Sequence, residues 1–131
     1  MDTAVKTAKI LVADDEPDMT SLVGRSLRLS GYDVLTAADG LECLDLARSE
    51  RPDVILLDNV MPHMDGLTAT RKLREFEATR DIPVILVTAL ADETSLAAAL
   101  RAGADGYIVK PFDYGTLLEK ISAVLEARSA P

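Results

Sequence analysis

The stretch VILLD, residues 54–58, holds four apolar residues in a row and ends in an aspartate. Three further short runs have the same apolar character: ILVA at 10–13, VILV at 84–87 and YIV at 107–109. Runs that are rich in β-branched residues and lack polar alternation are typical of strands buried on both faces of a parallel sheet. A fifth run, VLTA at 34–37, contains a threonine and suits an edge strand. These runs together predict five strands.

Segments in which apolar residues recur at helical spacing separate the five runs. They cover residues 19–27, 41–47, 67–76, 96–100 and 117–125. Strand and helix therefore alternate five times, which predicts an α/β fold of (βα)5 type, a doubly wound five-stranded parallel sheet with helices on both faces. Residues that commonly begin or end helices support this order: Pro17 in a first turn, Asp39, Asp65 and Asp113 as N-caps, and Gly31 and Gly103 beyond helix ends.

Length and charge narrow the class of protein. The 131 residues have the size of one ordinary domain, and we expect a single domain over residues 1–131 with its core at about 9–127. With 14 Lys and Arg against 22 Asp and Glu, the net charge of −8 disfavours direct binding of nucleic acid or of an anionic membrane surface. No apolar run is long enough to span a bilayer. A single cysteine, Cys43, excludes a disulfide scaffold and suits a cytoplasmic protein.

Polar residues follow four of the predicted strands. Asp14 and Asp15 follow the first strand, Asp58 ends the third, and Thr88 and Lys110 follow the fourth and fifth. Right-handed crossovers bring the carboxyl ends of parallel strands to one edge of the sheet, so these side chains are expected to meet there. Clustered carboxylates repel one another unless they take up protons or hold a hard cation, and Mg²⁺ is the natural occupant. The cluster therefore suits phosphoryl transfer, with Asp58 as the best candidate nucleophile.

These residues resemble the receiver domains of two-component response regulators. The resemblance runs from Lys9 to about Leu125, and its motifs in this order and spacing are highly specific to the family. They are Asp14-Asp15-Glu16, Asp58 followed by Met61-Pro62-x-Met64-Asp65-Gly66, Thr88-Ala89, Gly103-Ala104-Asp105-Gly106-Tyr107 and Lys110-Pro111-Phe112. The resemblance implies a flavodoxin-like fold with strand order 2-1-3-4-5.

The resemblance also implies a metal-dependent phosphorelay step that leaves an aspartyl phosphate. Asp58 would accept a phosphoryl group from a phosphohistidine on a sensor histidine kinase or a phosphotransfer protein. Asp15, Asp58 and the backbone carbonyl of Val60 would bind Mg²⁺, with Asp14 reaching the metal through water. Mn²⁺ could take the place of Mg²⁺.

In the family, the change at the phosphorylated residue is relayed to a surface. Thr88 and Lys110 would contact the phosphoryl oxygens, and Tyr107 would move inward as Thr88 is drawn toward the modified aspartate. The Lys110-Pro111 bond is cis in relatives, as an X-Pro bond allows. The fourth helix, fifth strand and fifth helix would then change their interactions with a downstream target, an output domain or a second copy of the chain.

Such a domain catalyses its own phosphorylation and dephosphorylation and is not an enzyme with a separate substrate. An aspartate-nucleophile phosphatase is a weaker alternative, because those enzymes carry Asp-x-Asp where this chain has Asp14-Asp15-Glu16. A flavin carrier needs a phosphate loop rich in small residues, and this loop is acidic. A receiver that acts as a scaffold without phosphorylation stays open, as does the choice between a stand-alone regulator and part of a longer protein.

Three further residues carry smaller expectations. Val60 and Leu90 stand two positions after Asp58 and Thr88, where polar side chains could orient a hydrolytic water, so we predict slow loss of the phosphoryl group. Cys43 is expected to be a packed, inert thiol.

Overall fold

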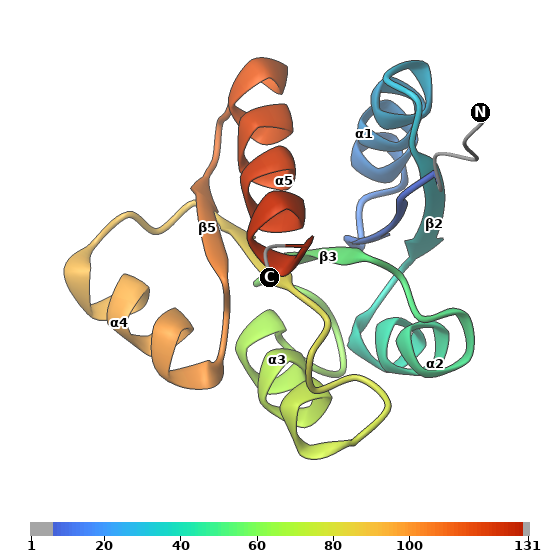
Figure 1. Cartoon of the computed structure of the whole chain (residues 1–131). Coiled ribbons are helices and arrows are strands. Elements are labelled where there is room, and N and C mark those ends of the chain that lie inside the picture. Colours follow the sequence, from blue (N-terminus) through green and yellow to red (C-terminus); the bar gives the residue numbers. More distant parts are fainter. Residues whose placement is uncertain (1–6, 130–131) are drawn as a thin grey trace.

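The computed structural model describes residues 7–129, and its five strands alternate with five helices (Figure 1). Residues 1–6 and 130–131, which belong to the expected domain, lie outside the described residues. The elements are β1 (Lys9–Ala13), α1 (Pro17–Leu29), β2 (Asp33–Ala37), α2 (Gly40–Glu50), β3 (Val54–Asp58), α3 (Gly66–Glu75), β4 (Val84–Thr88), α4 (Glu93–Ala102), β5 (Gly106–Val109) and α5 (Tyr114–Ser129). No helix within 7–129 is long and apolar enough to cross a membrane.

The sheet confirms the predicted topology. All neighbouring strands are parallel, in the order β2-β1-β3-β4-β5, which is the flavodoxin-type arrangement. In the register of the sheet, Leu11 of β1 lies opposite both Leu35 of β2 and Ile55 of β3. β2 is an edge strand, and Thr36 is one of its two exposed residues. β3 and β4, which have neighbours on both sides, are buried at every position.

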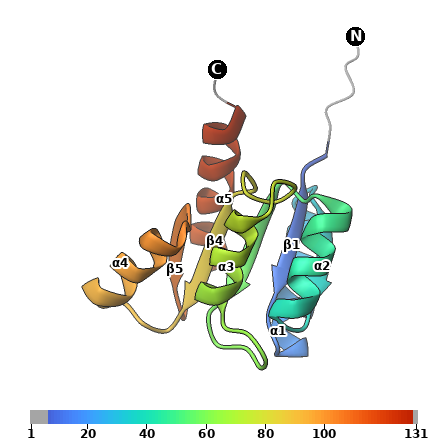
Figure 2. The same cartoon turned by 90° about the horizontal axis from the view of Figure 1, so that it is seen from below.

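The inner positions of the strands are mostly apolar because both faces of the sheet are covered. Alternate residues of a strand point to opposite faces. Ile10 and Val12 therefore join one core with α1 and α5, while Leu11 and Ala13 join a second core with α2, α3 and α4. Figure 1 shows α1 and α5 above the sheet and α2 and α3 below it, and in Figure 2, seen from below, α2 and α3 lie in front.

The predicted helix boundaries are mostly confirmed. Asp39 and Asp65 are N-caps, each accepting a hydrogen bond from the backbone N–H three residues on. Asp113 accepts from the N–H of Thr116 in the same way. Gly31 and Gly103 have φ of 97° and 103°, the left-handed region in which glycine is favoured after a helix.

The prediction that the third helix reaches Phe76 is wrong, because α3 ends at Glu75 and Phe76 has extended backbone. The chain turns there: the carbonyl of Phe76 accepts from the N–H groups of Thr79 and Arg80. Its ring lies under the guanidinium of Arg48, 4.9 Å from the ring centroid, instead of entering the core.

Candidate functional site

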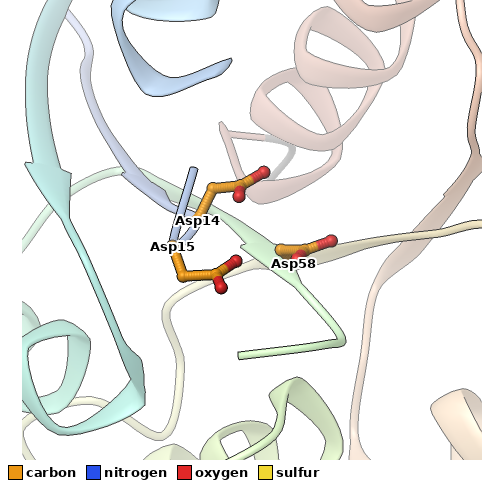
Figure 3. Close-up of side chains that lie close together, drawn as sticks. All are labelled: Asp14, Asp15 and Asp58. Carbon is orange, nitrogen blue, oxygen red and sulfur yellow. The ribbon is translucent and has the colours of Figure 1, made fainter. Parts of the chain in front are cut away.

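Three carboxylates meet at the carboxyl end of the sheet, as predicted. Asp14 and Asp15 follow β1, and Asp58 is the last residue of the neighbouring strand β3 (Figure 3). Each offers an oxygen within 4.8 Å of those of the other two. Asp14 and Asp58 are only 5% and 6% exposed, whereas Asp15 is exposed. Two of the three carboxylates are therefore largely removed from water, which makes their charge costly unless it is compensated.

Lys110 supplies part of that compensation. Its Nζ lies 2.8 Å from Oδ1 of Asp58 and 3.6 Å from Oδ2 of Asp14. The residue follows β5, and its backbone N–H donates to the carbonyl of Thr88 at 2.7 Å. The peptide bond between Lys110 and Pro111 is cis. One ammonium group thus pairs with two of the three carboxylates, and the cluster keeps an excess of acidic groups.

The titration of the cluster reflects this balance. Burial raises the pKa of Asp58 above its ordinary value, and the charges of Asp14 and Asp15 add to the effect, while the hydrogen bond and charge of Lys110 oppose it. Burial alone would lower the pKa of Lys110, but the hydrogen bond and charge of Asp58, with the charge of Asp14, raise it above its ordinary value. An oxygen-only donor set with excess negative charge fits a hard divalent cation.

Thr88 and Tyr107 line one small cavity, which Asn59, the residue after Asp58, also lines. Thr88 ends β4, is 4% exposed, and its Oγ1 accepts a hydrogen bond from the N–H of Leu90 at 3.1 Å. The hydroxyl of Tyr107 donates to the carbonyl of Leu90. Both side chains line a cavity of about 160 Å³ that reaches under α4. The β4–α4 loop is therefore tied to both residues.

The remaining residues singled out in the sequence are Val60 on the β3–α3 loop, Leu90 on the β4–α4 loop and Cys43 in α2. Val60 is 73% exposed, and Leu90 on the β4–α4 loop is 51% exposed. Cys43 is fully buried in α2, which confirms the expected packed thiol.

Two residues that close the β3–α3 loop were missed by the sequence analysis. The carbonyl and side-chain oxygens of Asn59 accept from the N–H groups of Gly66 and Leu67 at 3.0 and 3.2 Å. At Gly66, a Cβ would lie 2.7 Å from the backbone carbonyl oxygen of Asp58, so only glycine fits against this backbone without a shift. The glycine in the Met64-Asp65-Gly66 motif was the available signal, but its reason needs the fold.

Residues 10–122 match the response regulator receiver domain family, and the chain belongs to that family. It is 42% identical over 130 residues to the transcriptional regulatory protein PrrA of Mycobacterium tuberculosis, a match that covers 99% of this chain and 55% of that protein. The chain spans about half the length of the curated relatives it matches.

Solved structures agree in fold. The chemotaxis protein CheY4 of Vibrio cholerae is 34% identical with a TM-score of 0.87, covering 91% of this chain and 99% of that one. The receiver domain of sensor histidine kinase PA1611 from Pseudomonas aeruginosa is 33% identical with a TM-score of 0.85, covering 92% and 99%. That structure holds a magnesium ion coordinated in the active site cleft.

Family membership and site geometry together define the chemistry. The chain is a receiver domain, a phosphoacceptor in two-component signalling and not an enzyme with a separate substrate. Its acidic triad of Asp14, Asp15 and Asp58 is suited to Mg²⁺-dependent phosphorylation from a histidine kinase. This assignment disfavours the phosphatase and flavin-carrier alternatives.

Proposed function

We propose that residues 1–131 form a single receiver domain that is switched by phosphorylation of Asp58. The observation that carries the proposal is the position of Asp58: its Oδ1 lies 2.8 Å from the ammonium of Lys110 and beside two further carboxylates. An oxygen of Asp58 attacks the phosphorus of a phosphohistidine, the P–N bond breaks, and the imidazole leaves with the electron pair. The products are an aspartyl phosphate on this chain and an unphosphorylated histidine side chain on the donor.

The proposed metal is Mg²⁺, for which Mn²⁺ could substitute. Asp15, Asp58 and the backbone carbonyl of Val60 would hold it, and Asp14 would reach it through water. The donors are all oxygen, as Mg²⁺ prefers, and a related receiver domain holds magnesium in its cleft. When bound, the cation neutralises charge on the phosphoryl oxygens.

Lys110 and Thr88 would contact the phosphoryl group and carry the signal onward. The ammonium of Lys110 would turn from Asp58 to a phosphoryl oxygen, and the hydroxyl of Thr88 would donate to another. Tyr107 is the proposed switch residue because it lines the same cavity as Thr88 and both side chains bond to the backbone of Leu90. The hydroxyl of Tyr107 donates to the carbonyl of Leu90, and Oγ1 of Thr88 accepts from the N–H of Leu90. The output surface would be α4, β5 and α5, presented to a downstream target, an output domain or a second copy of the chain.

The proposed partner upstream is a sensor histidine kinase or a phosphotransfer protein, met in the cytoplasm, where the lone thiol stays reduced. A mostly apolar groove of about 620 Å³ lies beside the site, lined by Met19 and Leu22 of α1 and by Lys110, Phe112 and Tyr114. Leu22 is 65% exposed there. Because Lys110 belongs to both the groove and the site, a donor seated in the groove would have its phosphohistidine next to Asp58.

The first test is the intact mass after incubation with acetyl phosphate. We expect one added phosphoryl group that requires Mg²⁺, is lost with chelator, and is absent from Asp58→Asn. Asp45→Asn, an exposed aspartate of α2, is the matched control and should be modified like the wild type. A folded wild type that gains no phosphoryl group would refute the proposal and favour the unphosphorylated scaffold.

The docking groove is tested separately with two phosphoryl donors. Leu22→Asp should slow transfer from a histidine phosphotransfer protein but leave the reaction with acetyl phosphate unchanged, because acetyl phosphate needs no docking surface. Leu29→Asp, which changes an 83% exposed leucine at the last position of α1, is the control. Equal rates of transfer from the phosphotransfer protein to Leu22→Asp and Leu29→Asp would show that the donor does not dock in this groove.

A further inference from the structure

The second half of helix α4 is packed against the rest of the domain more closely than the first half. Its buried residues, Ala99 and Ala102, both lie in its second half, whereas Glu93, Thr94 and Leu96 in its first half are exposed. The cavity of about 160 Å³ next to Thr88 is also lined by residues from α4. In both views α4 lies at the outer edge of the molecule, beside β5 (Figures 1 and 2). Its first half therefore has little packing to lose.

The other end of α4 is fastened by one side chain from α3. Arg74 is in the last turn of α3 and is 22% exposed. Its Nε and Nη2 donate to the carbonyl of Gly103 at 3.0 and 2.8 Å, and Nη1 donates to the carbonyl of Ile82 at 2.7 Å. Nη2 also lies 2.8 Å from Oδ2 of Asp105. We call these four residues the Arg74 clasp.

The clasp joins three parts of the chain. Gly103 ends α4 with φ of 103°, and a Cβ there would lie 2.9 Å from Cγ of Arg74, so the arginine lies directly on the glycine. Asp105 is bound twice to Val84 at the start of β4: Oδ2 accepts from the N–H of Val84 at 2.9 Å, and the N–H of Asp105 donates to its carbonyl at 2.8 Å. The end of α4 is thus fixed to α3 and to a central strand.

We propose that the Arg74 clasp is a fixed pivot for α4. The inference rests on the proposed function: a displacement that begins at Thr88 and Tyr107 is confined to residues 93–98, while residues 99–105 stay in place. Charge-assisted hydrogen bonds from a planar guanidinium are costly to break. The opposite end of α4 moves over a cavity and loses few contacts. Arg74 is accordingly a positioning residue, distant from the phosphorylated aspartate.

The first test uses hydrogen exchange by NMR on the unmodified chain. The reporters for the pivot are the amides of Gly103, Ala104 and Asp105, which donate to the carbonyls of Leu100, Ala99 and Val84. We expect them to exchange at least about tenfold more slowly than the amides of residues 96–98. Arg74→Lys keeps the positive charge but loses the planar set of guanidinium donors. It should therefore remove the difference in exchange rate between residues 103–105 and residues 96–98.

Arg71→Lys is the matched control, because Arg71 lies on the same helix and is exposed. It should leave the exchange of residues 103–105 unchanged. Equal exchange along α4 in the wild type, or slow exchange of 103–105 in a folded Arg74→Lys variant, would overturn the pivot. If Arg74→Lys does not fold, Asp105→Asn serves instead, since its amide oxygen can still accept from Val84 while the ion pair is lost.

The second test adds acetyl phosphate and Mg²⁺. In the wild type, the change in amide exchange should be confined to residues 93–98, and in Arg74→Lys it should spread through residues 99–105 at an unchanged yield of phosphorylated protein. A merely structural role would alter stability without altering where the phosphorylation-dependent change stops. If the wild type gains no phosphoryl group, the proposed function fails, whereas the exchange pattern of the unmodified chain still decides whether a pivot exists.

Discussion

Cys43 shows at the scale of one residue how burial sets reactivity. Burial in α2, followed by the charge of Asp39, raises the pKa of the thiol to about 12. The thiolate is the reactive form, so at mildly alkaline pH the folded protein holds almost none of it. We expect iodoacetamide to leave the native protein unmodified and to label the chain completely in urea, as read by intact mass. Rapid labelling of the native protein would mean that the α2 region opens readily.

Val60 and Leu90 are the residues from which we predict slow loss of the phosphoryl group. Both side chains are apolar and exposed, at 73% and 51%, and neither can orient a water for hydrolysis. We expect a half-life of minutes or longer once the donor is removed, and Val60→Gln should shorten it by about tenfold because its amide can position water. Leu29→Gln, far along α1, is the control. A half-life of seconds in the wild type would contradict the prediction.

Two glycines test the packing at the scale of helices. At Gly66, the first residue of α3, a Cβ would lie 2.7 Å from the backbone oxygen of Asp58 and 2.9 Å from Cα of Asn59. At Gly24 in α1, the nearest atoms would lie at 3.5 and 3.6 Å, which is ordinary contact. Gly66→Ala should therefore lower the free energy of unfolding by about 1–3 kcal/mol, while Gly24→Ala should raise it by about 0.5–1 kcal/mol.

Urea denaturation of both variants measures these differences, and the intact-mass assay shows whether Gly66→Ala also impairs the reaction at Asp58. The matched pair separates a steric effect from the general preference of helices for alanine. Equal shifts in the two variants would show that the loop after β3 relaxes around the extra methyl group.

Strands were easier to predict than helix ends. β3 and β4 are buried on both faces, so apolar residues fill their first four positions, and their sequences stand out. α4 begins at Glu93, three residues before the predicted start at residue 96. The apolar spacing did not indicate this first turn, because the residues after the N-cap Asp92 are the polar Glu93, Thr94 and Ser95. Phe76 fits the helical spacing but lies beyond α3, since a turn that bonds to its carbonyl ends the helix.

At the scale of the whole molecule, the burial of Asp58 affects the free energy of unfolding. Burial and the neighbouring carboxylates raise the pKa of Asp58, so the folded chain holds this proton more tightly than the unfolded chain. The stabilisation is complete below the unfolded pKa and is lost as pH rises through the folded pKa. Above the folded pKa, the charged Asp58 therefore lowers the free energy of unfolding.

Asp58→Asn should accordingly raise Tm at neutral pH in the presence of chelator, with a gap that narrows as the pH falls. Added Mg²⁺ should raise the Tm of the wild type and have less effect on the variant, because a ligand that binds the folded state stabilises it. Asp45→Asn should behave as the wild type in both conditions. A lower Tm for Asp58→Asn would mean that its pairing with Lys110 outweighs burial.

The part of the site that could be predicted from the sequence consists of charged residues at the ends of strands. Asp14 and Lys110 follow strands and Asp58 ends one, and the crossover rule alone brings them to one edge. The Arg74 clasp left no such signal, because two of its acceptors are the backbone carbonyls of Ile82 and Gly103, which any residue would supply. Contacts of that kind depend on the packing of α3 against the end of α4, and only the folded chain reveals them.

The apolar side chains at the mouth of the site also bear on timing in a signalling circuit. With Val60 and Leu90 exposed there, the predicted slow hydrolysis makes the domain a memory element that averages its input over the lifetime of the aspartyl phosphate. Brief fluctuations in kinase activity would be smoothed out. A cell that relied on such an element would need a separate phosphatase activity to reset it quickly, and the two surface residues would set how much of that activity is required.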